Sequence, residues 1–326
     1  MHTKFIEILR CPRSGQRLNI ENPIVNNERI QSGELVSEDG RYSYPIKDFV
    51  PRFVPKSNYA DNFGIQWNKF RLTQLDSFSG HPISSDRFWA ATGWSADELK
   101  GRWVLDIGCG AGRFAEVALN AGAKVVALDY SSAIDACYAN LKHHPNLYAV
   151  QGDVYSLPFA AKSFPFIYSL GVLQHTPDVA KSFSRLPPLL DVSGKLCVDF
   201  YWKRFRTMMH AKYLFRPFTK TVETNKLFSF LEKAVPYLLI CSQILGRVPV
   251  AGKVLKRVVP VADYTGRFPL SDKQLKEWAL LDTFDMLAPE YDNPQSVSTV
   301  KKWFEEENFH DIEVFHAAHL VGRGRK

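Results

Sequence analysis

Cysteine is scarce in this sequence of 326 residues, and its spacing excludes two classes of protein. The chain has five cysteines, scattered and odd in number: Cys11, Cys109, Cys137, Cys197 and Cys241. They do not form the closely spaced pairs of a disulfide framework or of a zinc site. We therefore expect a chain that works in the reducing cytoplasm and holds no metal.

Long apolar runs are also missing. The beginning, MHTKFIEILRCPRSGQ, has neither the apolar core nor the small-residue cleavage site of a signal peptide. The longest apolar stretch, AVPYLLICSQIL at 234–245, is short for a bilayer and contains a proline. We expect no transmembrane segment.

Acidic residues are almost absent from one segment, although the whole chain carries a formal charge of only +7. Residues 201–260 contain two acids, Glu223 and Glu232, against twelve basic residues. These are Lys203, Arg204, Arg206, Lys212, Arg216, Lys220, Lys226, Lys233, Arg247, Lys253, Lys256 and Arg257. In YWKRFRTMMHAKYLFRPFTK the bases alternate with aromatic residues and methionines, which is typical of a surface that meets phosphate beside an apolar or stackable group. A solvated basic face on a helical cap would have the same composition.

Apolar runs and amphipathic segments alternate from residue 103 onward. The runs WVLDIG, KVVALD, NLYAVQGD, FPFIYSLG and KLCVDFY are separated by helical patterns. This alternation predicts parallel strands joined by right-handed crossovers. The pattern stops near residue 203 and resumes near 295 with a helix in SVSTVKKWFEEEN and strands in DIEVFHA and HLVGRG. We predict an α/β fold, a doubly wound, mostly parallel seven-stranded sheet with a helical insertion after its fifth strand.

The chain divides on this basis into a small N-terminal module at 1–55, a helical lid segment at 56–100, a cofactor-binding α/β core at 101–202, a basic, largely helical cap at 203–294, and a closing helix and strands at 295–326. Turn signals such as Ser14-Gly15 and Asp39-Gly40 indicate short strands in the module. In the lid segment, Ser95 followed by Glu98 predicts a capping box at a helix start. The many polar groups beside aromatic residues in that segment suit either a lid over a ligand or plain packing.

The sequence DIGCGAGR at 106–113 directly follows the first predicted strand. Glycines at 108, 110 and 112 let the chain turn tightly and let a ligand approach the backbone closely. A dinucleotide fold would require another glycine at 113, where this chain has Arg113. The carboxylate of Asp106 suits a ligand with a cationic amino group, such as S-adenosylmethionine, better than a pyrophosphate.

Two further acids end the next strands of the predicted sheet. Asp129 closes KVVALD, where a carboxylate can accept both hydroxyls of a ribose. Asp153 in VQGDVYSLPF can accept from an adenine amino group, and the Val154 N–H can donate to the ring. An ordered set of three strand-end acids points to an adenosyl ligand more strongly than a glycine turn alone.

The segments VLDIGCGAGRF, ALDYS, GDVYSLPF and LGVLQHTPD together resemble the class I S-adenosylmethionine-dependent methyltransferases. The resemblance implies S-adenosyl-L-methionine as cofactor. It further implies a set of cofactor-binding residues, namely Asp106, Gly108, Gly110 and Gly112 at the methionine and ribose, Asp129 and Tyr130 at the ribose, Asp153 and Val154 at the adenine, and Ser169 after the fourth strand.

The N-terminal module carries a second resemblance. LRCPRSGQRL and SEDGRYSYPIKDFVPRFV are similar to the small zinc-ribbon-like partner domain of tRNA methyltransferases. A metal-binding version would supply two CxxC pairs, but Ser14 stands where a second cysteine would be. We expect this degenerate module to be metal-free and to serve as a structural appendage.

Methyl transfer from a sulfonium is an in-line displacement, and alignment with exclusion of water supplies about 7–11 kcal/mol of barrier reduction. A dedicated base is therefore optional. For a hydroxyl acceptor, His175 at the end of the fourth strand is the first candidate base and Tyr201 the second. The histidine can alternatively serve only to shape the cofactor loop.

The sequence does not decide which class of molecule accepts the methyl group. One is an anionic small molecule or a glycan- or lipid-linked precursor, approached at the membrane surface, with LFSFLEKAVPYLLICSQIL as an apolar wall. Another is tRNA or rRNA, favoured by the basic charge. A third interpretation is a non-catalytic methyltransferase-like adaptor, which has no need of the three acids. The sequence does not define an oligomeric state. Candidate substrate contacts are Trp67, Arg71, Arg204, Arg206 and Tyr264.

The acids before the last helix can either pair with the basic cap or contact the acceptor. Asp282, Asp285 and Asp292 lie close in sequence to the basic cap. We expect these acids to pair with cap lysines and arginines, although they can alternatively close over the acceptor.

Overall fold

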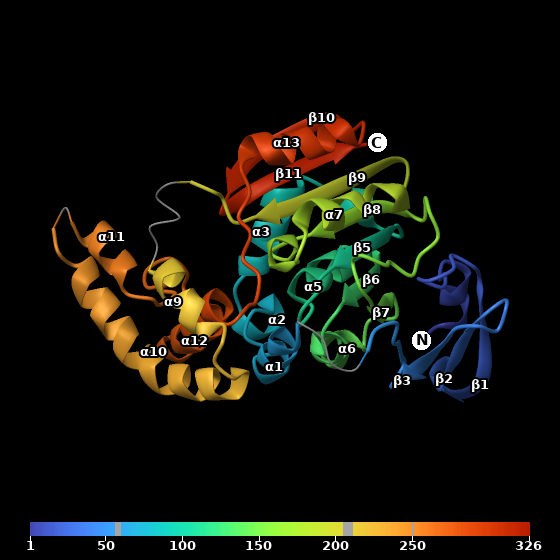
Figure 1. The fold of residues 1–326 in the computed structure, drawn as a ribbon, viewed down its shortest axis with the longest axis horizontal. Coiled ribbons are helices and arrows are strands. Elements are labelled where there is room, and N and C mark those ends of the chain that lie inside the picture. The colour runs from blue at the N-terminus through green and yellow to red at the C-terminus, as the bar shows by residue number, and fades with distance from the viewer. Residues whose placement is uncertain (56–59, 205–210, 250) are drawn as a thin grey trace.

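The N-terminal module is an antiparallel four-stranded sheet in the order β1-β2-β3-β4. The computed structural model describes residues 1–55, 60–204, 211–249 and 251–326. The elements of the module are the 3-10 helix η1 (Thr3–Glu7), β1 (Leu18–Asn26), β2 (Arg29–Ser37), β3 (Ser43–Lys47) and β4 (Val50–Pro51). Figure 1 shows the module at one end of the molecule, next to β7 of the main sheet.

The main sheet has seven strands in the order β10-β11-β9-β8-β5-β6-β7. They are β5 (Trp103–Ile107), β6 (Lys124–Asp129), β7 (Leu147–Gln151), β8 (Phe164–Ser169), β9 (Leu190–Phe200), β10 (His310–Ala317) and β11 (His319–Arg325). Strands β5 to β9 are parallel, whereas β11 pairs antiparallel with both β9 and β10. The predicted fold class is confirmed, including the insertion after the fifth strand of the sheet.

Helices cover both faces of this sheet (Figure 1). Before the sheet come α1 (Asp61–Lys69), α2 (Asp76–Ser79), α3 (Ile83–Thr92) and α4 (Ala96–Leu99), and within or after it come α5 (Arg113–Asn120), α6 (Ala133–Leu141), η2 (Leu173–His175), α7 (Val179–Ser184), η3 (Pro187–Leu189) and α13 (Val297–Glu306). Successive residues of β5 enter different cores, because Val104 packs in one apolar cluster and Leu105 in the other. The capping box of Ser95 and Glu98 at the start of α4 is confirmed.

The module and the main sheet share one hydrophobic core. Phe5 of η1 is 1% exposed, and its ring centroid lies 5.1 Å from that of Tyr148 in β7 and 6.4 Å from that of Trp103 in β5. The same buried cluster includes Leu35 of the module and Leu128 of the sheet. The N-terminal module is therefore packed as an integral part of the molecule.

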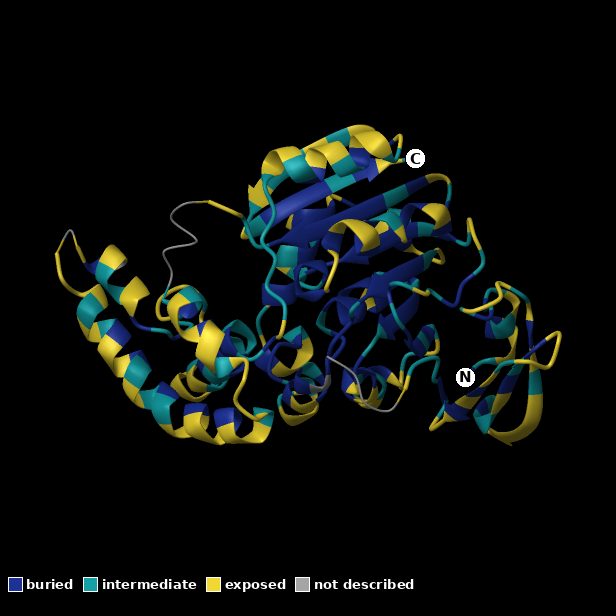
Figure 2. Ribbon diagram, in the orientation of Figure 1, coloured by how far each residue is buried: buried dark blue, intermediate teal, exposed yellow. Residues whose placement is uncertain are grey.

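The cap lies at the opposite end of the molecule from the module (Figure 1). Its described helices are α9 (Lys212–Thr219), α10 (Thr224–Gly246), α11 (Gly252–Leu255), η4 (Lys256–Val258) and α12 (Asp272–Leu287). Leu231, Val235 and Leu239 of α10 pack with Phe284 of α12 in a separate apolar cluster. The outer side of α10 is largely exposed (Figure 2).

Helix α10 corrects one expectation from the sequence. Its 23 residues continue through Pro236, so the proline does not break the apolar stretch. The helix begins at Thr224, and Leu227, Phe228 and Leu231 extend its apolar content toward the N-terminus. Among the described helices, α10 is long and apolar enough to cross a membrane by length and composition alone, and 33% of its most apolar window is buried.

Candidate functional site

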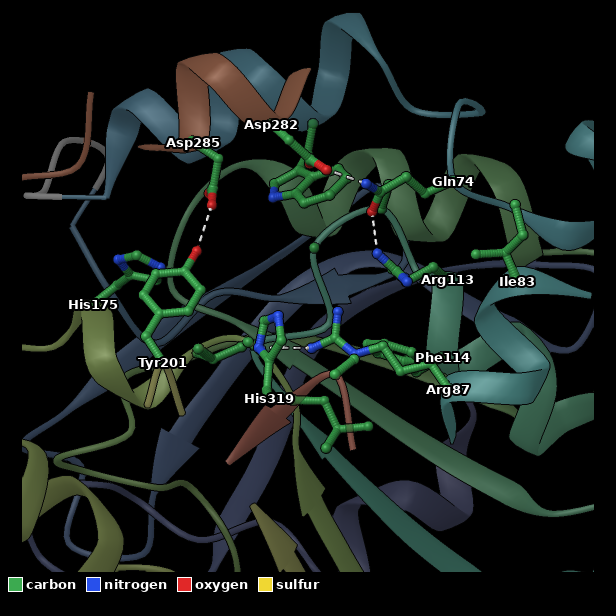
Figure 3. Close-up of a pocket in the computed structure, with 18 of the residues that line it drawn as sticks. Gln74, Ile83, Arg87, Arg113, Phe114, His175, Tyr201, Asp282, Asp285 and His319 are labelled. Atoms are coloured by element: carbon green, nitrogen blue, oxygen red, sulfur yellow. Dashed lines mark hydrogen bonds between the residues drawn. The ribbon is translucent and has the colours of Figure 1, made fainter. Parts of the chain in front are cut away.

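A cavity of about 1230 Å³ lies at the carboxyl ends of the parallel strands. One wall is built from the turn after β5 and from the ends of β6 and β8. The opposite wall comes from α1, α3 and α12, and Figure 3 shows side chains of α3, α5 and α12 converging there. A single small-molecule pocket occupies about 300–1,000 Å³, so this cavity has room for two molecules.

The glycine turn is held between two side chains that leave no room for a Cβ atom. Gly108 has φ +78°, and a Cβ on it would overlap the side chain of Val172. A Cβ on Gly110 would lie 3.2 Å from the Trp67 indole. Both glycines and Trp67 line the cavity. Glycine at these positions therefore lets the turn pack closely against Val172 and Trp67 at the wall of the cavity.

Asp129 lies at the end of β6 and lines the cavity beside this turn. Its Oδ2 accepts from the Gly110 N–H at 2.9 Å, and its Oδ1 accepts from the N–H and hydroxyl of Ser131 at 2.9 and 2.7 Å. An ionised carboxylate has about four acceptor positions, so one remains for a ligand hydroxyl. Burial raises the pKa of Asp129, and each of these hydrogen bonds lowers it.

Asp106 lies beneath the turn and does not line the cavity. The residue is 2% exposed, and burial raises the pKa of its carboxyl to about 8. Its Oδ2 has no hydrogen-bond partner among the described residues. A buried carboxyl of this kind is ready to pair with an incoming ammonium group, although direct contact requires approach through the turn.

Three other predicted cofactor residues support the wall of the cavity without lining it. Ser169 donates its hydroxyl to the Ile107 carbonyl at 3.0 Å, and Asp153 accepts from the Tyr155 N–H at 2.9 Å. A Cβ on Gly112 would contact Leu141 at the packing of α5 on α6. Their direct contact with the cofactor stays a prediction, whereas Tyr130 and Val154 do line the cavity.

Two half-buried arginines, Arg87 and Arg113, line the opposite wall of the cavity. Arg87 of α3 donates to Asp199 at 2.7 Å and lies 3.4 Å from Nδ1 of His319. Burial lowers the pKa of His319 to about 3, so the ring is neutral and accepts this hydrogen bond (Figure 3). Arg113 at the start of α5 donates to Gln74, and no described carboxylate lies within ion-pair distance of it. Burial lowers the pKa of Arg113 to about 10, which leaves it charged at neutral pH.

Acids of α12 close this wall from above in the view of Figure 3. Asp282 accepts from Gln74 at 3.1 Å and from the Tyr264 hydroxyl, and burial raises its pKa to about 6. Asp285 accepts from the Tyr201 hydroxyl at 3.0 Å. The expected pairing of these acids with the basic cap is thus wrong for Asp282 and Asp285, since both turn toward the cavity.

Asp292 does make the expected pairing. It pairs with Lys212 at 2.7 Å and with Arg216 at 3.7 Å. Asp292 pairs with the cap because it lies beyond the end of α12 and meets α9. Asp282 and Asp285 lie within α12 and face the cavity.

His175 follows β8 and lines the cavity between Phe63 and Tyr201. Its Nδ1 lies 2.9 Å from the carbonyl oxygen of Tyr291, which can only accept, so Nδ1 carries the proton. Nε2 then has a lone pair, and it has no hydrogen-bond partner among the described residues. This tautomer is the one that a general base requires.

The predicted substrate residues divide between two places. Trp67, Arg204 and Tyr264 line the cavity, together with the two candidate bases. Arg71 lies outside it, because its exposed guanidinium donates to the Asn140 side chain at 2.7 Å, and its predicted substrate contact is not supported. Arg206 falls outside the described residues.

The residues that sequence reasoning misses are Arg87 and His319, whereas Gln74 is one of the polar groups of the predicted lid and Arg113 stands out only as a departure from a glycine pattern. Each of these side chains lies on a different element from its partner, so no local spacing could reveal the network. The one usable signal was an arginine inside the apolar segment DRFWAA of the predicted lid.

The described residues contain no group of three or more His, Cys, Asp or Glu side chains arranged for a metal ion. In the N-terminal module, Cys11 is buried, with its Sγ 3.3 Å from the Tyr44 hydroxyl.

The parallel sheet, the glycine turn and the strand-end carboxylate define a class I methyltransferase type of domain. Residues 105–198 match the family described as a methyltransferase domain, and residues 2–48 match the family described as Trm112p-like protein. Both resemblances predicted from the sequence are confirmed over these residues. Over residues 105–198 the chain thus matches a methyltransferase domain, and S-adenosylmethionine is the cofactor consistent with that match.

Several characterised relatives resemble part of the chain. The ubiquinone biosynthesis O-methyltransferase of Coxiella burnetii is 31% identical over 124 residues, which cover 36% of this chain and 53% of the relative. The tRNA U34 carboxymethyltransferase of Pseudoalteromonas translucida is 32% identical over 133 residues, which cover 37% of this chain and 41% of the relative. The chain spans about half the length of the relatives it matches. Among solved structures, magnesium protoporphyrin IX methyltransferase from Synechocystis with bound SAH aligns at 14% identity, with a TM-score of 0.45, over 82% of this chain and 96% of that one.

Proposed function

We propose that this chain is an S-adenosylmethionine-dependent methyltransferase that acts on an oxygen or nitrogen atom of an anionic small molecule or of a glycan- or lipid-linked precursor. The observation that carries the proposal is one cavity in which the glycine turn and Asp129 face a wall of arginine, histidine and tyrosine side chains. One wall suits the adenosyl donor and the other suits an acceptor.

The cofactor supplies an electrophilic methyl group on a sulfonium when it is bound. Asp129 has the free acceptor position for a ribose hydroxyl, and the backbone of Gly108 and Gly110 allows close approach. Trp67 covers Gly110 and excludes water from that side of the cavity. These groups orient the donor, which is the principal contribution of a protein to an in-line displacement.

Arg113 provides the main argument for an anionic acceptor. Arg113 is half-buried, lines the cavity and makes no ion pair with a described carboxylate, so an anionic ligand in the cavity would stabilise its charge. Its Nε is buried and unpartnered among the described residues, while the bond to Gln74 holds one end of the guanidinium in place. Carboxylate and phosphate groups match this fork-shaped donor.

His175 is the better of the two candidate bases. Its Nε2 has no hydrogen-bond partner among the described residues, whereas Tyr201 commits its hydroxyl proton to Asp285. Burial and the nearby acids Asp285 and Asp292 raise the pKa of Tyr201 well above its usual range, so it stays protonated. For a hydroxyl acceptor, we infer that His175 takes the proton as the methyl group is transferred.

Calorimetric titration with S-adenosylmethionine tests the donor site. We expect binding to the wild type, and Asp129→Ala should weaken it by roughly 1–3 kcal/mol, because ligand hydroxyls lose a charged acceptor. Asp135→Ala changes an exposed carboxylate outside the cavity and serves as the control. An absence of binding to the wild type would favour the non-catalytic adaptor instead.

A screen with methyl-labelled cofactor identifies the acceptor class. Label should enter the small-molecule or lipid fraction of a lysate, and Arg113→Gln should raise the KM for the acceptor while leaving the cofactor Kd unchanged. If Arg113→Gln weakens cofactor binding instead, the guanidinium holds the carboxylate of the cofactor, and the argument for an anionic acceptor fails.

An RNA acceptor is the second candidate function. It is favoured by the Trm112p-like match at residues 2–48, by the similarity to a tRNA U34 carboxymethyltransferase and by the basic cap. Labelling confined to the RNA fraction of the same screen would establish this alternative.

A further inference from the structure

Helix α9 has its charged and apolar faces reversed. Lys212 and Arg216 are each 7% exposed, whereas Leu214 and Phe218 are 69% and 72% exposed. In water the opposite arrangement is expected of an amphipathic helix. The charges are turned inward and the apolar side chains outward.

The inward charges have well-defined partners, so the reversal is built into the packing. Lys212 pairs with Asp292 at 2.7 Å, and Arg216 donates to the carbonyl oxygens of Met286 and Pro289 at 3.1 and 2.9 Å. These bonds fix the orientation of α9 against the segment that follows α12. The apolar face of α9 is therefore held outward.

Helix α10 presents a second outward apolar stripe. Phe230, Tyr237, Ile240 and Ile244 recur at helical spacing and are 53–73% exposed. The other face of the helix already packs on α12. A helix that is apolar on both faces is typical of a buried or membrane-contacting element. Figure 2 shows the outer side of α10 at the edge of the molecule, with no other element over it.

The distribution of exposed apolar residues singles out the cap. Among the described residues, seventeen large apolar side chains are exposed, and eleven of them lie between residues 214 and 258. This set, the apolar cap surface, comprises Leu214, Phe215, Phe218, Val222, Phe230, Tyr237, Ile240, Ile244, Val248, Val254 and Val258. Scattered single apolar residues need no explanation, but such a concentration marks an interaction surface.

Charge complementarity identifies the occupant of this surface. Eight basic residues lie between residues 214 and 258, and the two acids of that stretch are already paired, Glu223 with Lys226 and Glu232 with Lys69, at 3.2 Å each. A second copy of the cap would bring like charge against like charge. RNA would match the charge but not the aliphatic side chains. An anionic bilayer surface matches both.

We propose that α9, α10 and α11 dock the protein on the surface of an anionic lipid bilayer, with the apolar cap surface inserted at headgroup level. Helix α10 lies in the interface and does not cross it, because its inner face packs on α12 and Lys226, Glu232 and Lys233 lie along its first half. Lys212 of α9 and Arg257 of η4 also line the cavity, so the docked elements and the site share one structural unit.

Vesicle co-sedimentation with the full chain tests this proposal and needs neither methyl donor nor acceptor, so its outcome is independent of the proposed function. We expect binding to phosphatidylcholine vesicles that contain phosphatidylglycerol, little binding to phosphatidylcholine alone, and release by high salt. Binding to neutral vesicles that equals binding to anionic ones, or no binding to either, overturns the proposal. Retention at high salt overturns the in-plane placement of α10.

Surface variants locate the contact. Tyr237→Ser combined with Ile240→Ser and Ile244→Ser should lower vesicle affinity at least tenfold, and Lys233→Gln should lower it about fivefold. Ile24→Ser combined with Val25→Ser is the matched control, because these residues are equally exposed (63% and 58%) but lie in the N-terminal module. An equal loss in the control overturns the proposal. So does a dimer in light scattering that the α10 variant converts to a monomer, which would assign the surface to a second copy.

Discussion

At the scale of the residue, the site depends on a few buried polar groups whose ionisation is set by their surroundings. His175 is held as the tautomer with a free Nε2 by a single backbone carbonyl, and Asp106 is kept neutral by burial. The sequence predicts both as site residues, because Asp106 lies at the end of the first predicted strand and His175 lies in the segment after the fourth. It could not predict the pairing of Arg87 with Asp199, since that contact joins α3 to a strand 112 residues away.

His175→Gln tests the proposed base. The variant keeps a polar side chain but removes the Nε2 lone pair, so kcat should fall by about 10²–10⁴-fold with little change in cofactor Kd. Rate and binding measurements on the same preparations check this. The exposed His310→Gln on β10 is the control. An unchanged pH profile and rate in His175→Gln would leave the histidine a purely structural role.

Asp106 makes a pH-dependent contribution to stability. Its pKa is about 8 in the folded chain, against an ordinary value near 3.9, so the folded state binds the extra proton between these limits. The stability from this group is complete below about pH 4 and is lost as pH rises through about 8, with a slope of at most about 1.4 kcal/mol per pH unit.

Asp106→Asn should remove that slope. Urea unfolding at several pH values should give a variant that gains stability over the wild type as pH increases. The exposed Asp97→Asn should leave the pH dependence unchanged. Parallel curves for wild type and Asp106→Asn would contradict the assignment of a raised pKa.

At the scale of the element, the turn from β5 to α5 is the part that the sequence predicts best. Its glycine spacing dictates the backbone path, because φ is positive at Gly108, Gly110 and Gly112. The cap is predicted least well. Its helical character follows from composition, but the reversed burial of α9 depends on Asp292, which lies 80 residues further along the chain. Pro236 was misread for a similar reason, since the packing of α10 on α12 stabilises a continuous helix.

A pair of glycine variants separates the stability cost of a left-handed backbone conformation from the cost of a side-chain overlap. Gly101 and Gly108 both have positive φ, but only Gly108 has a neighbour, Val172, in the space of a Cβ. Gly101→Ala should cost roughly 1–2 kcal/mol from the left-handed conformation alone. Gly108→Ala should cost roughly 1–3 kcal/mol more in denaturant unfolding, from overlap with Val172.

The second substitution Val172→Ala should recover most of the additional loss in Gly108→Ala. Equal losses in the two glycine variants would show that Val172 moves aside freely.

At the scale of the whole molecule, the module and the cap differ in whether they share a hydrophobic core with the sheet. The module shares a core with the sheet, while the cap has its own apolar cluster around α10 and α12. The parallel character of β5 to β9 and the insertion point follow from sequence alternation. The docking of the module against β7 does not, because Phe5, Trp103 and Tyr148 carry no pattern that links them.

Phe5→Ala tests whether module and sheet unfold together. Removing a buried phenylalanine typically costs about 3–5 kcal/mol, and here the loss should appear in a single transition that includes the sheet. Near-ultraviolet circular dichroism and cofactor binding should follow the same melting curve. Phe78→Ala, at a side chain that is 51% exposed, should change little. A separate early transition for the module would contradict a shared core.

The bridge that Gln74 makes between Arg113 and Asp282 has a consequence for synthesis of the chain. Its two hydrogen bonds join segments of the lid, the core and the cap, and the second spans 208 residues. During translation, the donor side of the cavity is encoded long before the α12 residues that complete the acceptor side. The cavity is therefore incomplete until α12 has been synthesised and Gln74 of the lid segment has packed against Asp282.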